Sequence, residues 1–207
     1  MVNTLVCLES VPRRVFASAL EWPGWCRPGR TEQDALEALA AYASRYATVT
    51  SKAGVNFPTT HGFEIVERLA GNVTTEFGAP AVVAEYDRRP LDAKAAKRLA
   101  LLVDACWQVF EGVVATAPAT LKKGPRGGGR DRDQVDRRVA EAEVSYARTL
   151  GIRLGNNLPE IRESVIELLG SPSNGEPPVE KGWPPRYAAR RIAWHVMDHA
   201  WEIEDKS

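Results

Sequence analysis

The last part of the chain, residues 185–204, is the feature that most constrains its fold. Two of the three histidines in the sequence, His195 and His199, lie here four residues apart. On a helix this spacing places both imidazoles on one face, as a divalent metal site requires. Two of the six tryptophans, Trp194 and Trp201, lie in the same stretch. We therefore ask what packs against this helix and what completes a site on it.

The rotation of the helix separates its imidazole face from its tryptophan face. With 100° per residue, His199 lies about 20° and His195 about 60° from Ile192, at the border of the predicted core face. Glu202 follows at about 80°, where it is a candidate ligand or a hydrogen-bond acceptor that orients an imidazole. The two tryptophans project from nearly the opposite side. We expect their face to meet the N-terminal part of the chain or a second subunit.

Charge and cysteine content exclude several classes of protein. Lys and Arg total 27 and Asp and Glu also total 27, so no global charge favours nucleic acid or anionic membrane. No segment approaches the roughly 20 apolar residues that span a bilayer, and the N-terminus does not resemble a signal peptide. Cys7, Cys26 and Cys106 are few, odd in number and far apart, which is typical of reduced thiols in a cytoplasmic protein.

The N-terminal third predicts a small α+β layer in the order β-β-α-β. Residues 4–8 and 14–20 are β-prone, and residues 21–30 are rich in turn formers. Thr31 is a good N-cap for a helix, with Asp34 at its third position. A further strand is expected at residues 63–69, where apolar and polar residues alternate.

One phrase of this region resembles a known family. Residues 16–25 read Phe-Ala-Ser-Ala-Leu-Glu-Trp-Pro-Gly-Trp, and Gly-Arg-Thr at 29–31 precedes an alanine- and leucine-rich helix. This pattern resembles the HicB-like antitoxin domain over about residues 3–70, which implies an α/β layer that recognises a protein. HicB antitoxins usually add a DNA-binding segment, but no helix-turn-helix or ribbon-helix-helix pattern follows here. We therefore expect no nucleic-acid partner.

The remaining two thirds of the chain predicts four helices after a linker. Pro and Gly punctuate residues 76–90, which we interpret as the connection between domains 1–75 and 91–207. The expected helices are one that Asp92 caps and Pro118 ends, a second with its apolar stripe between Val135 and Leu150, a third from about Pro159 to Gly170, and the last, which Pro184 and Pro185 open. The predicted fold class is α+β, with a helical bundle in the second domain.

The end of the last helix resembles a second family. Residues 193–204, Ala-Trp-His-Val-Met-Asp-His-Ala-Trp-Glu-Ile-Glu, are similar to the last helix of the DinB/YfiT-like superfamily, over about residues 91–207. Its members are four-helix bundles, many of which bind a divalent metal through one histidine on the second helix and His-x-x-x-His on the fourth. Some transfer small thiols such as mycothiol or bacillithiol, and others are hydrolases or isomerases. The resemblance implies a Zn²⁺ or Ni²⁺ site and a small thiol as substrate.

The second helix lacks the histidine that this resemblance requires. Arg138 stands roughly where it is expected, and a guanidinium has no free lone pair with which to bind a cation. Glu143, about one turn further on, could replace it as a carboxylate ligand. The candidate metal ligands are therefore His195, His199, Glu143 and Glu202. The alternative is a degenerate bundle in which the histidines make ordinary hydrogen bonds and Arg138 pairs with Glu202 or Asp198.

Two loops could contribute to such a site. The loop at 122–133 is basic and glycine-rich and leads into a helix N-terminus, so it could hold an anionic small molecule. Arg126, Arg130 and Arg138 are the candidate substrate-binding residues, although the loop could also be an ordinary connection. His61 is either an exposed loop histidine or a third imidazole ligand.

Three classes of function remain open, and the sequence does not decide whether the chain is an enzyme. The first is a metal-dependent thiol transferase or hydrolase, in which the metal lowers the pKa of a bound thiol or water. The second is a non-catalytic binding or regulatory protein that uses the HicB-like layer for recognition. The third is a structural oligomer, such as a homodimer formed through the tryptophan faces. No membrane partner is expected.

Overall fold

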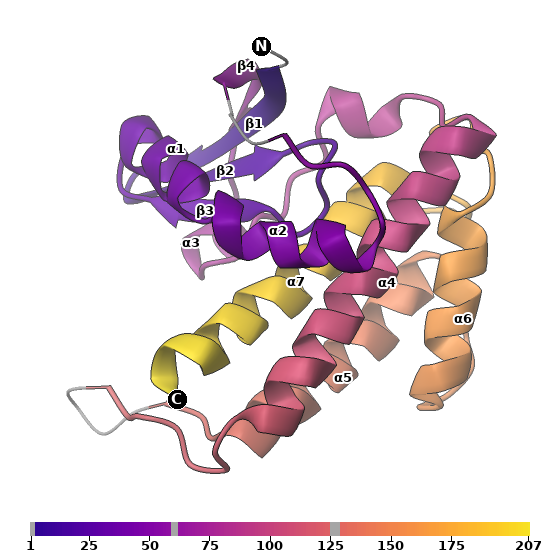
Figure 1. Cartoon of the computed structure of the whole chain (residues 1–207). Helices are drawn as coiled ribbons and strands as arrows, with labels where there is room; N and C mark the ends of the chain where they lie inside the picture. Colours follow the sequence, from indigo (N-terminus) through magenta and orange to yellow (C-terminus); the bar gives the residue numbers. More distant parts are fainter. Residues whose placement is uncertain (1–2, 59–61, 125–128) are drawn as a thin grey trace.

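The N-terminal third of the computed structural model, which describes residues 3–58, 62–124 and 129–207, forms a four-stranded mixed sheet (Figure 1). The strand order is β3-β2-β1-β4. β1 (Asn3–Val11) pairs antiparallel with β2 (Arg14–Ala19), which pairs antiparallel with β3 (Cys26–Gly29). β4 (Gly62–Ala70) runs parallel to β1. A parallel pair needs a crossover, and α1 (Glu32–Ala41) and α2 (Ala43–Lys52) lie within it.

Local sequence signals account for most of this layer. The three strands and the helix start expected from the sequence are confirmed, and Thr31 and Asp34 form a capping box at the N-terminus of α1. β3 was not predicted, because its residues belong to a turn-rich segment. Gly29 ends β3 against α1, where a Cβ atom would lie 2.2 Å from the backbone nitrogen of Ala35. The residue types that suggested a turn therefore serve a close approach between strand and helix.

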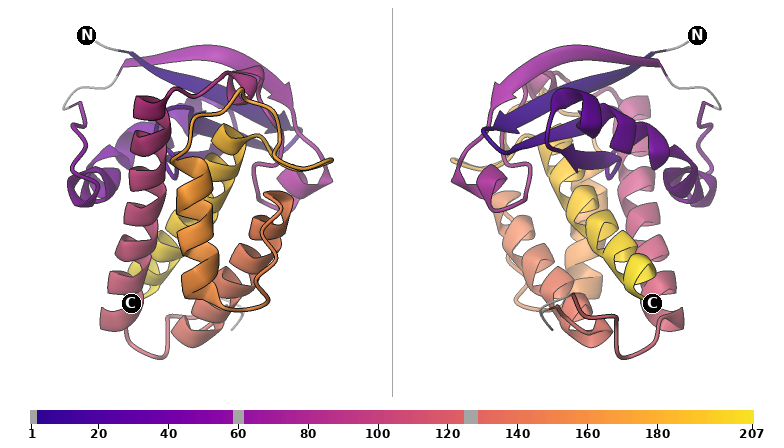
Figure 2. Two further views of the ribbon diagram at one scale, coloured as in Figure 1. Left: turned by 90° about the vertical axis from the view of Figure 1, so that its right-hand side faces the viewer. Right: turned by 90° about the vertical axis from the view of Figure 1, so that its left-hand side faces the viewer.

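Four long helices make up the remainder of the fold. They are α4 (Ala93–Thr116), α5 (Arg132–Thr149), α6 (Leu158–Leu169) and α7 (Pro185–Lys206). They contact one another beneath the sheet, as both views of Figure 2 show. The predicted α+β class is confirmed at this level: a mixed sheet at the N-terminus, followed by several helices.

α7 lies between the two parts of the fold. Sixteen of its 22 residues are buried. On one side it contacts α4, α5 and α6. On the other, Trp194 packs edge-on to Phe16 of β2, with ring centroids 6.1 Å apart, and Trp201 packs against Tyr42, with centroids 4.9 Å apart. The expectation that the tryptophan face meets the N-terminal part of the chain is confirmed.

The segment expected to be a linker is fixed by carboxylates. It follows α3 (Val73–Glu76) and contains the 3-10 helix η1 (Glu85–Arg88). Glu9 of β1 accepts hydrogen bonds from the backbone N–H groups of Ala81 and Val82, and Glu67 of β4 accepts those of Glu85 and Tyr86. Because these bonds tie residues 81–86 to the sheet, the segment is part of the packed structure. The domain boundaries at 75 and 90 stay a prediction.

A buried ion pair joins this segment to α7. Arg190 donates to both oxygens of Asp87, at 2.9 and 2.5 Å, and both side chains are buried. Asp87 also accepts the N–H of Ala84. The pKa of Arg190 lies well above its ordinary value: burial lowers it, but Asp87, together with Cys7 and Tyr187, raises it more. The two charges depend on each other, because neither has water to replace the lost partner.

α4 is more apolar than the sequence analysis allowed. By length and composition it could cross a membrane, which corrects the expectation that no segment approaches this limit. Nine of its 24 residues are buried within the chain, where it contacts α7, α2 and α6. A core helix passes the same test of length and composition, so this finding is weak evidence for a membrane span.

We predict that Arg190→Met destabilises the fold by about 3–5 kcal/mol, because Asp87 is left charged and unpaired in the interior. Urea denaturation would measure the loss. The control is Arg68→Gln, which breaks an exposed pair with Glu32 and should change the free energy of unfolding little. Equal stability of the two variants would show that the buried pair does not hold α7 to the sheet.

Candidate functional site

The two histidines of α7 form a buried pair of rings. Their centroids lie 4.7 Å apart with the planes perpendicular, and each residue is 7% exposed. Nδ1 of His199 lies 2.8 Å from Oε2 of Glu202, whose other oxygen accepts from Nζ of Lys206 at 2.5 Å. The hydrogen bond with His199, together with Lys206, lowers the pKa of Glu202 to about 2. Glu202 is therefore an ionised hydrogen-bond partner of His199 and Lys206.

His195 has a different environment. Its ring packs edge-on to Tyr146 of α5, with centroids 5.6 Å apart, and its Nδ1 atom is buried without a hydrogen-bond partner in the described part of the chain. Burial, followed by His199, Arg191, Arg138 and Arg130, lowers the pKa of His195 to about 2. The imidazole is therefore neutral at physiological pH and lies among cations.

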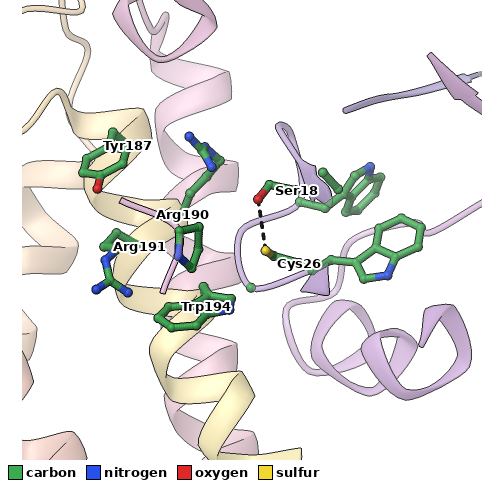
Figure 3. Close-up of a pocket in the computed structure, with 11 residues that line it drawn as sticks. Ser18, Cys26, Tyr187, Arg190, Arg191 and Trp194 are labelled. Carbon is green, nitrogen blue, oxygen red and sulfur yellow. Dashed lines mark hydrogen bonds between the residues drawn. The ribbon is translucent and has the colours of Figure 1, made fainter. Parts of the chain in front are cut away.

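Arg191 lies one turn before His195 on the same helix. It is 9% exposed, and its guanidinium carbon lies 4.6 Å from the ring centroid of Trp194 and 5.3 Å from that of Tyr146. Its Nη1 atom has no hydrogen-bond partner among the described residues. Figure 3 shows its side chain on the side of α7 away from Ser18 and Cys26. The guanidinium thus contacts Tyr146 of α5, while Arg191 also lines the small pocket that contains Ser18 and Cys26.

The basic loop and the start of α5 add further cations. A surface hollow of about 440 Å³ is lined by Gly129, Arg130, Gln134, Arg137, Arg138 and Glu141. Its arginines form no ion pair among the described residues. Arg138 and Arg191 each lower the pKa of Tyr146, which burial raises. Arg138 and Arg191 thus both act on Tyr146 and His195. The predicted Arg126 lies outside the described residues, as does His61.

Glu143, the fourth proposed metal ligand, belongs to another cluster. It is buried, and Arg162 of α6 donates to its two oxygens at 2.8 and 3.1 Å. Arg162 also pairs with Glu111 of α4. Burial raises the pKa of Glu143, and Arg162 opposes this. Arg162 thus joins Glu143 of α5 to Glu111 of α4, and both oxygens of Glu143 are already occupied.

These neighbours do not fit a bound divalent cation. Within residues 3–58, 62–124 and 129–207, no group of three His, Cys, Asp or Glu side chains is placed to hold a metal. Glu202 is shared with Lys206, and three arginines act on His195. A divalent metal at the imidazoles would be repelled by these charges. The donor set resembles a site for an anion more than one for a metal.

The sequence predicts only part of this cluster. Arg138 and Arg130 were selected, and the structure brings their charges to bear on His195. Arg191 and Tyr146 are not part of the predicted site, because the sequence indicates only a helical position for Arg191 and a core position for Tyr146. Arg191 lies four residues before His195, the same spacing that singled out the histidines. That signal could have found it.

The depressed pKa of His195 predicts a loss of stability in mild acid. Below its ordinary pKa of 6.5, the unfolded chain binds a proton that the folded chain does not, so stability falls as pH falls. Between pH 7 and pH 5 this contributes about 2 kcal/mol of lost stability. Glu202 does not interfere, because its lowered pKa costs stability only as pH falls below about 4.5.

Urea denaturation at the two pH values, compared with His195→Asn, measures this contribution. The variant cannot titrate and should lose about 2 kcal/mol less than the parent. The same pH dependence in both proteins would contradict the neutral, buried state of His195.

Comparison with known proteins does not place the chain in a family. No protein-family model matches it, and no curated protein or solved structure gives a significant match. The function is therefore argued from the residues of the site themselves.

Proposed function

We propose that this chain is a small-molecule-binding protein whose ligand is an anion, held at the cationic cluster of Arg130, Arg137, Arg138 and Arg191. The observation that carries the proposal is that Arg130, Arg137 and Arg138 line one hollow together with a single acid, Glu141, and form no ion pair among the described residues. Two of these arginines, with Arg191, also lower the pKa of the neutral His195. The segments outside the described ranges, 1–2, 59–61 and 125–128, contain no Asp or Glu that could pair with them.

This grouping contrasts with the rest of the chain. The total charge is balanced, and the larger ion-paired clusters elsewhere join elements of the fold, as Arg27 does with Asp198 and Arg45 with Glu204 and Asp205. Single exposed arginines without a partner need no explanation. Several arginines near a buried guanidinium raise the local electrostatic potential, and this positive potential attracts an anion and accelerates its binding.

We also infer that the helical part is DinB-like and has lost metal binding. Four helices pack together, the last carries His-x-x-x-His at the border of the core, and the charge of Arg138 acts on His195 from the second helix. These features support an origin in a metal-binding bundle in which an arginine replaces the third histidine. The ligand pocket of such a bundle would remain, with its charge reversed.

A catalytic role has less support than binding. The thiols of all three cysteines are buried, and burial raises the pKa of Cys7 to about 11 and that of Cys26 to about 12. They are therefore poor nucleophiles. A metal-dependent transferase or hydrolase would need a ligand set that the described residues do not supply. A small thiol remains a candidate ligand if it carries an anionic group.

The tryptophan faces no longer support the hypothesis of a structural oligomer. Trp194 and Trp201 were expected to form a subunit contact if the N-terminal part did not cover them, and both are buried against that part. A homodimer stays a prediction without a surface assigned to it. Recognition of a protein by the HicB-like layer also stays a prediction.

Anion binding can be tested by thermal unfolding at low ionic strength with inorganic phosphate and with citrate. We expect a saturable rise in Tm, because a ligand that binds only the folded state stabilises it. The double variant Arg137→Gln/Arg138→Gln should lose most of the rise. Arg148→Gln removes the same kind of charge from the other end of α5 and should keep it. Equal shifts in all three proteins would indicate an effect of ionic strength alone.

The inferred loss of metal binding predicts a gain in one variant. Arg138→His places a third imidazole on the second long helix and removes a repelling charge, so Zn²⁺ should raise its Tm. Arg138→Gln removes the charge without adding a ligand and should not respond, nor should the parent protein. Zinc binding by the parent at one equivalent, or no response of Arg138→His, would contradict the inference.

A further inference from the structure

Arg191 is a buried cation without a counter-ion. Only 9% of its surface is exposed, and no carboxylate pairs with it among the described residues. A charge removed from water is unfavourable unless a partner of opposite sign replaces the water. Stacking on Tyr146 and Trp194 compensates only part of this, since a ring offers a quadrupole and not a charge. The free protein therefore holds a guanidinium that is poised to accept an anion.

Most of the acids nearest to Arg191 pair with other cations, and Asp136 and Glu141 of α5 form no ion pair with it among the described residues. On α7, Asp198 pairs with Arg27, and Glu202 pairs with His199 and Lys206. The neighbouring residue Arg190 takes both oxygens of Asp87. Glu143 of α5 is bound by Arg162. None of the acids in the described residues forms an ion pair with Arg191, so we expect its counter-ion to come from outside the chain.

Further polar atoms at the same place lack partners. Nδ1 of His195 and Nε1 of Trp194 are buried without a hydrogen-bond partner in the described ranges, as is Nη1 of Arg191. These three residues lie within one turn of α7. Buried polar atoms are nearly always hydrogen-bonded, so three neighbouring exceptions point to a missing partner. A group with oxygen acceptors would satisfy the guanidinium and the indole, and the imidazole if its proton lies on Nδ1.

Aromatic side chains lie beside this position. Tyr146 and Trp183 are only half-buried, and their ring centroids lie 5.1 Å apart. Trp183 also packs edge-on to Tyr187, again with centroids 5.1 Å apart. Since Tyr146 contacts both Arg191 and His195, this cluster connects the buried guanidinium with the surface. A ligand that reaches Arg191 from this side meets aromatic rings first, and these favour a flat apolar body.

We propose that Arg191 binds the carboxylate or phosphate of a small aromatic anion, whose ring packs against Tyr146 and Trp183. The inference rests on the proposed function and specifies its ligand: Arg130, Arg137 and Arg138 attract the anion, and Arg191 holds it. The two oxygens of a carboxylate or phosphate match the fork of the guanidinium. His195, one turn from Arg191, supplies a further hydrogen bond to the anion when its proton lies on Nδ1.

Isothermal titration calorimetry with phenyl phosphate, benzoate, inorganic phosphate and benzyl alcohol tests the proposal. Phenyl phosphate or benzoate should bind the parent protein at least about tenfold more tightly than inorganic phosphate, because the ring adds apolar contact. Which of the two binds more tightly distinguishes a phosphate from a carboxylate headgroup. Benzyl alcohol should not bind, since it lacks the charge. Tighter binding of inorganic phosphate than of both aromatic anions would overturn the proposal.

Two variants locate the ligand. Arg191→Met keeps an apolar side chain and should weaken the binding of the aromatic anion by about tenfold or more. Trp183→Leu should reduce the difference in affinity between the aromatic anion and inorganic phosphate. Arg191→Met should also be at least as stable as the parent, because it removes an unpaired buried charge, whereas Arg190→Met, its neighbour, should be destabilised. A strongly destabilised Arg191→Met would mean that Arg191 already has its counter-ion within the chain, and would overturn the proposal.

The outcomes separate this inference from the proposed function. One outcome is that Arg191→Met binds the aromatic anion as the parent does, while Arg137→Gln/Arg138→Gln does not bind it. The ligand is then bound by Arg137 and Arg138 and not by Arg191. The chain would then be an anion-binding protein, and the role of Arg191 would be wrong. If the parent binds none of the three anions, the proposed function itself fails.

Discussion

The burial of α7 between the sheet and the other long helices is the constraint on which the structure depends. Sixteen of the 22 residues of α7 are buried, so the helix must pack against a different neighbour on each side. Its tryptophans pack against Phe16 and Tyr42, its small apolar residues lie in the core, and His195 packs against Tyr146 of α5. Because these contacts come from distant parts of the sequence, removal of any one side would expose an apolar or charged face. The sheet and the helices therefore fold around a common element.

The charges of α7 show how such a helix can be both structural and functional. Arg190 is neutralised by Asp87, and its loss should weaken the fold. Arg191, the next residue, stacks on Tyr146 and Trp194 and forms no ion pair among the described residues. Most carboxylates that could have served it instead accept backbone N–H groups or bind other arginines. A neutral His195 completes a place where a cation is unfavourable and an anion is favourable. Two adjacent residues of one type thus have opposite consequences for stability.

Sequence patterns predict the elements of this fold better than their contacts. Helix caps, apolar stripes and the two faces of the last helix follow local chemistry, and they gave the strands, four helices and the covered tryptophans. β3 is not predicted from the sequence, because Pro28 and Gly29 are typical of turns. Residues 76–90 were interpreted as a linker because their partners, Glu9 and Glu67, lie on strands far away in the sequence. The ion pair of Glu143 with Arg162 is equally non-local. Histidine spacing drew attention to a metal, whereas the charges that surround the imidazoles are visible only in three dimensions.

The most direct test of the account is a crystal structure of the protein grown with phenyl phosphate. The account predicts phosphate oxygens within hydrogen-bond distance of the Arg191 guanidinium, with the phenyl ring against Tyr146 and Trp183 and the pair Asp87–Arg190 unchanged. A phosphate bound only at the surface by Arg137 and Arg138 would contradict the role of Arg191. A metal ion held by His195 and His199 would contradict the account as a whole.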